Sequence, residues 1–257
     1  MTARPLITVL RAALAGLVVL AMPAVVGAQT AEAVSREAVE RIVREYLVRN
    51  PEVLQEAFTE LERRQAEAQK VAQASALRQV RGSLTAGAQI AVGNPQGDIT
   101  LIEFFDYNCG YCKRALGDIQ GLVKSDPKLR VVLKDLPVLG PESVEASRLS
   151  LAASQQLSGD KLFEYHAKLL NTRGRVNGER ALAVARDLGL DMARLQKDAE
   201  GPLVQAALRE NSQLAEKLGL NGTPAFIVGE EIIPGAVGQE PLKQAIASAR
   251  KCGGTSC

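Results

Sequence analysis

The stretch Thr100–Cys112, with the sequence TLIEFFDYNCGYC, decides how the rest of the chain is interpreted. Its first half, Thr100–Phe105, is rich in β-branched and aromatic residues and predicts a buried strand. Its end carries Cys109 and Cys112, separated by two residues. The apolar spacing that follows predicts a helix over about residues 110–124. The two cysteines are therefore expected at a strand-to-helix junction.

A cysteine at such a junction lies beside the free N–H groups and the positive dipole end of the helix, which favour a thiolate. Cys109 is therefore predicted to be a nucleophile with a lowered pKa. Cys112, one turn further and facing inward, would resolve a mixed disulfide. A structural disulfide and half of a zinc site are the alternatives, but His166 is the single histidine and the other cysteines are distant. The pattern favours redox chemistry and no metal.

Outward from this stretch, the chain predicts an α/β domain over residues 86–251. The cysteines lie in a βαβ unit, and a ββα unit closes the domain. Between the two units, residues about 141–219 contain helical patterns and no convincing strand. The remaining strands are expected at 89–92, 130–134, 225–228 and 231–233, before a last helix with Pro241 near its start.

A proline begins the strand expected at 225–228, in the sequence Gly222-Thr223-Pro224-Ala225. At this position a proline removes no hydrogen bond from the sheet. If the Thr223–Pro224 bond is cis, the Thr223 backbone would face Cys109 and pair with an extended substrate segment. An ordinary trans turn proline is the alternative, and the residues alone leave both open.

Residues 1–28 have the three parts of a secretory signal peptide. Arg4 and Arg11 precede an uncharged run that ends in small residues at Ala28. The run is shorter than the roughly 20 residues that span a bilayer, although an uncleaved anchor is the alternative. We expect cleavage after Ala28 and export. The remaining chain has 29 basic and 29 acidic residues, few aromatics and no basic run, so nucleic acid is not an expected partner.

Residues 29–85 predict a separate helical region. Apolar residues repeat at helical spacing on both sides of Asn50-Pro51, first from Val39 to Leu47 and then from Val53 to Leu61. From Glu62 to Arg81 they are too sparse for a core, which is typical of a solvated helix or semi-rigid linker. Two short helices cannot bury their apolar faces alone. We expect a homo-oligomer through residues 34–85, with packing on the main domain as the alternative.

The stretch Glu103–Cys112 resembles the active site of the DsbA-like family of periplasmic thiol–disulfide oxidoreductases. The resemblance covers about residues 88–251. It implies a thioredoxin-like fold, a cis Pro224 beside the cysteines and a periplasmic location. It also implies exported protein substrates with disulfides, and a membrane thiol reductase or a membrane oxidant as redox partner. Arg36–Arg63 resembles the oligomerisation segment of the ScsC-type copper-sensitivity suppressor proteins.

The dipeptide Gly110-Tyr111 departs from DsbA, which has Pro-His there and a valine before its cis-proline. A histidine at that place stabilises the thiolate and makes a strong oxidant. Because Tyr111 carries no charge, the disulfide is expected to be less oxidising. Together with Thr223, the dipeptide resembles disulfide isomerases of the same compartment. An isomerase or reductase is therefore favoured over a DsbA-like oxidase, with substrate contacts at Gly110, Tyr111 and Thr223.

Glu103 leaves two alternatives open. Strand alternation places it on the same face as Leu101 and Phe105, and the family has an acid close to its cysteines there. A carboxylate at this position would relay a proton to Cys112. The alternative is that Glu103 pairs with a cation such as Lys134 and does not affect the pKa of the cysteines.

The tail 252–257 carries Cys252 and Cys257, which have no place in the family pattern. A small disulfide, a soft-metal site for Cu(I) and an auxiliary redox pair are the alternatives. Apart from a redox-active Cys109–Cys112 disulfide, no cofactor is expected.

Overall fold

The computed structural model describes residues 35–86 and 90–253. The predicted signal peptide and Cys257 therefore lie outside the described residues. In the described ranges, no helix combines the length and the apolar character that crossing a membrane requires. The chain divides into two compact units, which meet in sequence between Phe58 and Thr59.

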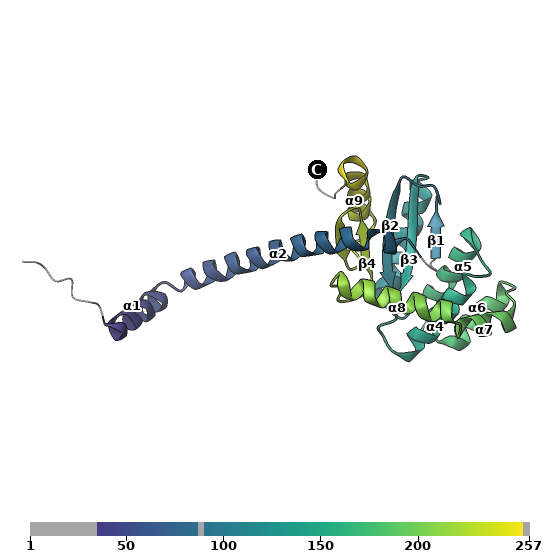
Figure 1. Ribbon diagram of the computed structural model, residues 1–257, viewed down its shortest axis with the longest axis horizontal. Helices are drawn as coiled ribbons and strands as arrows, with labels where there is room; N and C mark the ends of the chain where they lie inside the picture. Colours follow the sequence, from purple (N-terminus) through teal and green to yellow (C-terminus); the bar gives the residue numbers. More distant parts are fainter. Residues whose placement is uncertain (1–34, 87–89, 254–257) are drawn as a thin grey trace, which may run out of the picture. The chain divides into compact units, whose positions relative to one another are not determined.

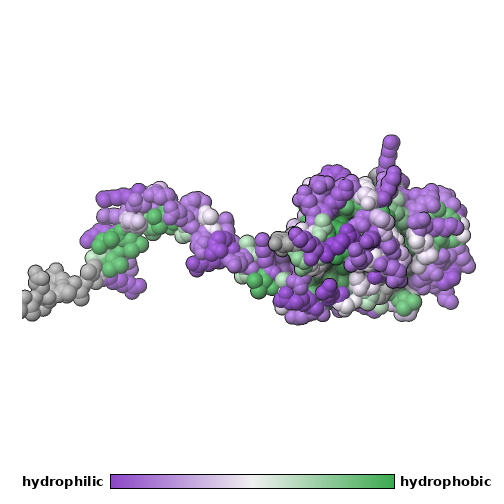
Figure 2. All heavy atoms as spheres, turned by 90° about the horizontal axis from the view of Figure 1, so that it is seen from above, coloured by the Kyte–Doolittle hydropathy of each residue, from purple (hydrophilic) through white to green (hydrophobic). Residues whose placement is uncertain are grey.

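The first unit contains helix α1 (Arg36–Arg49) and the beginning of α2 (Glu52–Leu84). The Ser35 side chain caps α1 by accepting a hydrogen bond from the Ala38 N–H. No residue of α1 is buried. Figure 2 shows hydrophobic side chains gathered on this segment. The exposed apolar residues are Val39, Ile42, Val43, Tyr46, Val48, Leu54 and Phe58.

In the second unit, the described strands form one mixed sheet in the order β1-β3-β2-β4-β5. The parallel pair β2 and β3 is joined by a helix, which gives the expected βαβ unit, and the other neighbouring pairs are antiparallel. This topology confirms the thioredoxin-like α/β fold. The strands are β1 (Ile90–Gly93), β2 (Ile99–Phe105), β3 (Leu129–Asp135), β4 (Ala225–Val228) and β5 (Glu231–Pro234).

Helices cover both faces of this sheet (Figure 1). Helices α3 and α9 contact each other and the sheet on one face, while α8 packs against β3. Helices α4 to α8 form the insertion between β3 and β4, where the sequence predicts only helices. The helices of this unit are α3 (Gly110–Ser125), α4 (Pro141–Ala153), α5 (Gly159–Leu170), α6 (Gly178–Asp187), α7 (Met192–Ala199), α8 (Pro202–Lys217) and α9 (Gln239–Cys252).

Strand β2 contributes to a hydrophobic core on each side of the sheet. Leu101 and Phe105 belong to the core that contains α3, α9 and the insertion. Ile102 and Phe104 belong to the opposite core, which α8 completes. Because successive side chains of a strand point to opposite faces, a strand buried on both sides has an almost continuous apolar sequence.

The end of α2 is buried, although the sequence suggests a solvated linker from Glu62 to Arg81. Leu77, Val80 and Leu84 belong to the core on the α8 side of the sheet. Their spacing of three and four residues places them on one face of the helix. This narrow apolar stripe is enough for α2 to pack against the sheet. The last turns of α2 are therefore part of the second compact unit.

Candidate active site

Cys109 is the N-cap residue of α3, and its side chain makes no capping hydrogen bond. The pKa of its thiol is lowered to about 5, chiefly by a hydrogen bond with Cys112. Burial opposes this shift, while the Thr223 side chain and the backbone N–H groups of Cys112 and Tyr111 lower the pKa further. The N–H groups at the helix start and the Thr223 side chain together stabilise the negative sulfur of a thiolate.

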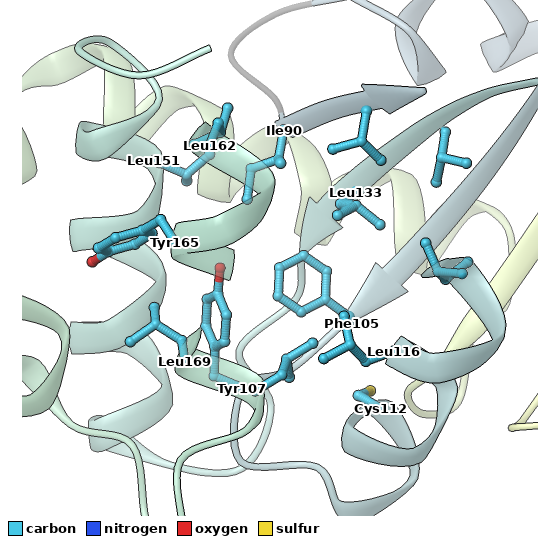
Figure 3. Close-up of a cluster of buried hydrophobic side chains, with 14 of the residues drawn as sticks. Ile90, Phe105, Tyr107, Cys112, Leu116, Leu133, Leu151, Leu162, Tyr165 and Leu169 are labelled. Atoms are coloured by element: carbon cyan, nitrogen blue, oxygen red, sulfur yellow. The ribbon is translucent and has the colours of Figure 1, made fainter. Parts of the chain in front are cut away.

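Cys112 lies one turn into α3 and is fully buried, whereas Cys109 is 7 % exposed. Figure 3 shows Cys112 beside Leu116 of the same helix and near the ring of Phe105. The hydrogen bond to Cys109, burial and the charge of Glu103 raise the pKa of the Cys112 thiol. Both thiols are free in this structure. The pair thus combines an ionised outer sulfur with a protonated inner one.

The Thr223–Pro224 peptide bond is cis. When it is protonated, the Cys109 thiol donates a hydrogen bond to the Thr223 carbonyl oxygen at 3.2 Å. Tyr111, the second residue of the dipeptide between the cysteines, is 58 % exposed, and the Arg114 guanidinium lies 4.2 Å from its ring centroid. The fold therefore brings the Thr-Pro loop, the reactive sulfur and an exposed aromatic ring together.

Glu103 is buried in β2, and its Oε1 atom has no hydrogen-bond partner among the described residues. Burial raises its pKa to about 8, with smaller contributions from the charges of Cys109 and Asp118. Lys134 is in register with Phe104, on the other face of the sheet, and its Nζ donates to Asn211 Oδ1 at 3.3 Å. Strand alternation therefore separates Glu103 from the cation that the sequence offers as its partner.

Replacing Glu103 by glutamine tests the cost of burying this acid. Because its folded pKa of about 8 exceeds the unfolded value of 4.5, stability is lost as the pH rises from 4.5 to 8. Glutamine stays neutral, so Glu103→Gln should raise the free energy of unfolding at pH 7 by on the order of 3 kcal/mol. The gain should vanish near pH 4. Urea unfolding of the reduced protein across this range measures it.

The exposed variant Glu62→Gln serves as the control for this experiment and should show the pH dependence of the wild type. Parallel stability profiles for the wild type and Glu103→Gln would contradict the burial of a neutral acid at this place.

Asp106 is a site residue that the sequence analysis missed. It is fully buried between β2 and the cysteines, and four groups donate to its carboxylate. These donors fix the loop that carries Cys109 to the segment that follows β3. They are the backbone N–H groups of Asn108 at 2.7 Å, Val138 at 2.9 Å and Leu139 at 3.0 Å, and the Ser143 hydroxyl at 2.7 Å.

Asn108, directly before the first cysteine, ties the same loop to the helical insertion. Its Oδ1 accepts from the Val176 N–H at 2.7 Å, and its Nδ2 donates to the Val176 carbonyl oxygen at 2.9 Å. Lys113 adds hydrogen bonds to the carbonyl oxygens of Thr172 and Gly174. The Asn108 Nδ2 also donates to the Ser143 hydroxyl at 3.0 Å. Because Val176 and Ser143 lie far along the chain, no local sequence pattern indicates these contacts.

His166 and the tail cysteines lie outside this arrangement. Burial lowers the pKa of His166 to about 3, and its Nδ1 atom is 3.1 Å from the Tyr107 hydroxyl in a buried contact. Cys252 at the end of α9 is engaged in a disulfide. In the part of the chain that the structure describes, no cluster of three or more histidine, cysteine or acidic side chains could hold a metal ion. The roles suggested for the tail, Cu(I) binding included, stay predictions.

Two family models match the chain. The model of the DSBA-like thioredoxin domain matches residues 100–247, which are more than half of the chain and include Cys109, Cys112 and Pro224. The model of the copper resistance protein ScsC N-terminal domain matches residues 36–68. Both resemblances proposed from the sequence are thereby confirmed.

Curated relatives are similar to part of this chain. The thiol:disulfide interchange protein DsbA of Bordetella pertussis is 30% identical over 135 residues, which are 52% of this chain and 64% of that protein. The Na(+)/H(+) antiporter NhaA 1 of Salinispora arenicola is 26% identical over 159 residues, which are 61% of this chain and 24% of the antiporter. The chain thus spans about a quarter of the antiporter and less than two thirds of DsbA.

Solved structures match a larger part of this chain than these curated relatives do. A thioredoxin-like oxidoreductase from Silicibacter pomeroyi is 44% identical, with a TM-score of 0.63, and the match covers 67% of this chain and 98% of that one. Proteus mirabilis ScsC in a transitional conformation is 26% identical, with a TM-score of 0.62. That match covers 84% of this chain and 96% of ScsC, so it extends beyond the catalytic domain.

Proposed function

The chain belongs to the family of DSBA-like thioredoxin domains, and on this premise we propose that it exchanges disulfides in proteins through Cys109 and Cys112. The observation that carries the proposal is the position of Cys109 as the N-cap residue of α3 with Cys112 one turn further, an arrangement that lowers the pKa of the Cys109 thiol. A thiolate at neutral pH is the attacking species in thiol–disulfide exchange.

The reaction begins when the Cys109 thiolate attacks one sulfur of a substrate disulfide. A mixed disulfide forms, and the other substrate sulfur leaves as a thiolate. Cys112 then loses its proton and attacks the Cys109 sulfur, which releases the second substrate thiolate and leaves a Cys109–Cys112 disulfide. Two electrons pass to the substrate. We propose that Glu103, in the minority of molecules in which it is ionised at neutral pH, accepts the Cys112 proton, because its charge acts on the pKa of that thiol.

The acidity of Cys109 supports isomerase or reductase activity over that of a strong oxidase. Its pKa of about 5 lies between about 7 for thioredoxin and about 3.5 for DsbA. A less acidic thiol stabilises the reduced form less, so the disulfide is a weaker oxidant than that of DsbA. Gly110 and the exposed Tyr111 would contact substrate beside Thr223.

We also propose that the protein forms a homo-oligomer through the first unit. Its helices carry apolar residues that are half or more exposed, including Ile42 at 59 % and Tyr46 at 55 %. A second copy of this face would remove that surface from water, which favours association. The match to the ScsC N-terminal domain covers this segment.

The double variant Ile42→Glu/Tyr46→Glu is expected to be monomeric, because it places charges in the centre of the apolar face. Analytical ultracentrifugation of the wild type and the variant checks this. Arg44→Glu changes charge on the same helix away from that face, so it should keep the wild-type mass. A wild-type protein that sediments as a monomer would contradict the proposal.

Refolding of ribonuclease distinguishes the activities. The reduced protein should reactivate scrambled ribonuclease, and the monomeric variant should lose this activity while still reducing insulin. Rapid oxidation of reduced ribonuclease without reactivation of the scrambled form would instead identify a dithiol oxidase. Point variants are required, because a chain that begins near residue 85 would lack the core residues Leu77, Val80 and Leu84.

Residues 1–28 support the further proposal that the chain is exported to the periplasm and cleaved after Ala28. An isomerase there would depend on a membrane thiol reductase to keep Cys109 and Cys112 reduced, whereas an oxidase would depend on a membrane oxidant. N-terminal sequencing of the protein from a periplasmic extract should begin at Gln29.

A further inference from the structure

A groove of about 650 Å³ begins at the active site and extends along α2. Tyr111 and Thr223 line it at the catalytic end, and Thr223 is the residue whose carbonyl oxygen accepts a hydrogen bond from the Cys109 thiol. The opposite wall consists of Ala66, Gln69, Lys70 and Gln73. All lining residues belong to the second compact unit.

The position of this wall follows from the packing of α2. Ala66, Lys70 and Gln73 continue, at spacings of three and four residues, the helix face that buries Leu77 and Val80. Because these apolar residues fix the end of the helix against the sheet, the turns before them lie along the Thr-Pro loop. The segment that the sequence assigns to a linker thereby lines the approach to the reactive sulfur.

The lining is chemically suited to a polypeptide. Amide side chains of Gln69, Gln73 and Asn221 can donate to and accept from a backbone. Lys70 is the one charged side chain among the described residues that line the groove. The rest of the surface is mainly apolar, with Leu220, Pro224, Ala225, Ile232, Pro234 and Ala236.

We propose that this groove binds an extended apolar segment next to the substrate cysteine that becomes joined to Cys109. The inference rests on the proposed function, and it specifies that substrates with apolar residues beside the reacting cysteine are preferred. Substrate attached to the Cys109 sulfur lies beside Thr223, so a chain that leaves this point along the groove passes between the Thr-Pro loop and α2. Apolar side chains gain by burial there, and Lys70 repels basic ones.

Symmetric peptide disulfides with leucine, serine or lysine beside the cysteine test this preference. The reduced full-length protein reduces each to two peptide thiols while Cys109 and Cys112 form a disulfide, and oxidised glutathione is the reference without a polypeptide. Relative to glutathione, the wild type should reduce the leucine peptide about tenfold faster than the serine peptide, and the lysine peptide most slowly.

Ala66→Trp fills the groove and should abolish the tenfold advantage of the leucine peptide. Ala68→Trp, two residues along α2 and therefore on the other side of the helix, should keep it. Lys70→Glu should make the lysine peptide a better substrate than in the wild type. A leucine advantage that survives Ala66→Trp would overturn the inference. If the wild type does not reduce even glutathione disulfide, the proposed disulfide exchange itself is overturned, not only the role of the groove.

Discussion

Replacement of Cys109 by serine is expected to lower the rate of protein disulfide reduction by at least about a thousandfold, to the uncatalysed rate. A serine hydroxyl at the start of α3 stays protonated at neutral pH, so no sulfur nucleophile remains there. Reduction of insulin by a dithiol, with and without the variant, measures the loss. The double variant Cys252→Ser/Cys257→Ser makes the same chemical change in the tail and should stay within about twofold of the wild type.

Cys112→Ser is the complementary variant. It keeps the attacking thiolate and removes the resolving one, so a mixed disulfide with substrate should accumulate and be visible by mass spectrometry. Activity of Cys109→Ser above the background rate would show that another thiol attacks. Equal accumulation of mixed disulfide in the wild type and in Cys112→Ser would contradict the role of Cys112.

Asp106→Ala is expected to lower the free energy of unfolding by about 4 kcal/mol, because several buried donors lose their acceptor together. Three of these donors are backbone N–H groups of the loops beside the cysteines, and the fourth is the Ser143 hydroxyl. Urea unfolding of the wild type and the variant measures the change. Asp106→Asn keeps one oxygen acceptor and should lose less.

Asp187→Ala provides the matched control, because Asp187 is exposed near the end of α6. Its effect should lie within about 0.5 kcal/mol, as is usual for surface substitutions. A loss below about 1 kcal/mol for Asp106→Ala would show that the loop is held by other contacts.

The catalytic fold was predictable because its signals are local. The apolar run at Ala225–Val228 gives β4 its observed bounds, and the run ending at Phe105 gives β2 to within one residue. The cysteine spacing and the helix signal place Cys109 at the start of α3, where the structure has it. The match to the ScsC N-terminal domain over residues 36–68 confirms a resemblance assigned to Arg36–Arg63.

Contacts between distant parts of the chain could not be predicted in this way. Asp106 and Asn108 stand directly before Cys109, but the groups that bond them follow β3 or lie in the insertion. Leu77 is buried because it packs on one face of the sheet, and the α2 sequence alone does not indicate that contact. Strand register, rather than composition, excludes Lys134 as the partner of Glu103.

Titration of the Cys109 thiol tests the central claim most directly. The reduced protein with Cys252 and Cys257 replaced by serine leaves only the active-site pair, and thiolate absorbance in the ultraviolet follows its ionisation. The arrangement at the start of α3 predicts one thiol that ionises near pH 5, while Cys112 stays protonated to high pH. A first ionisation near pH 8.5, as for an ordinary cysteine of about that pKa, would contradict it.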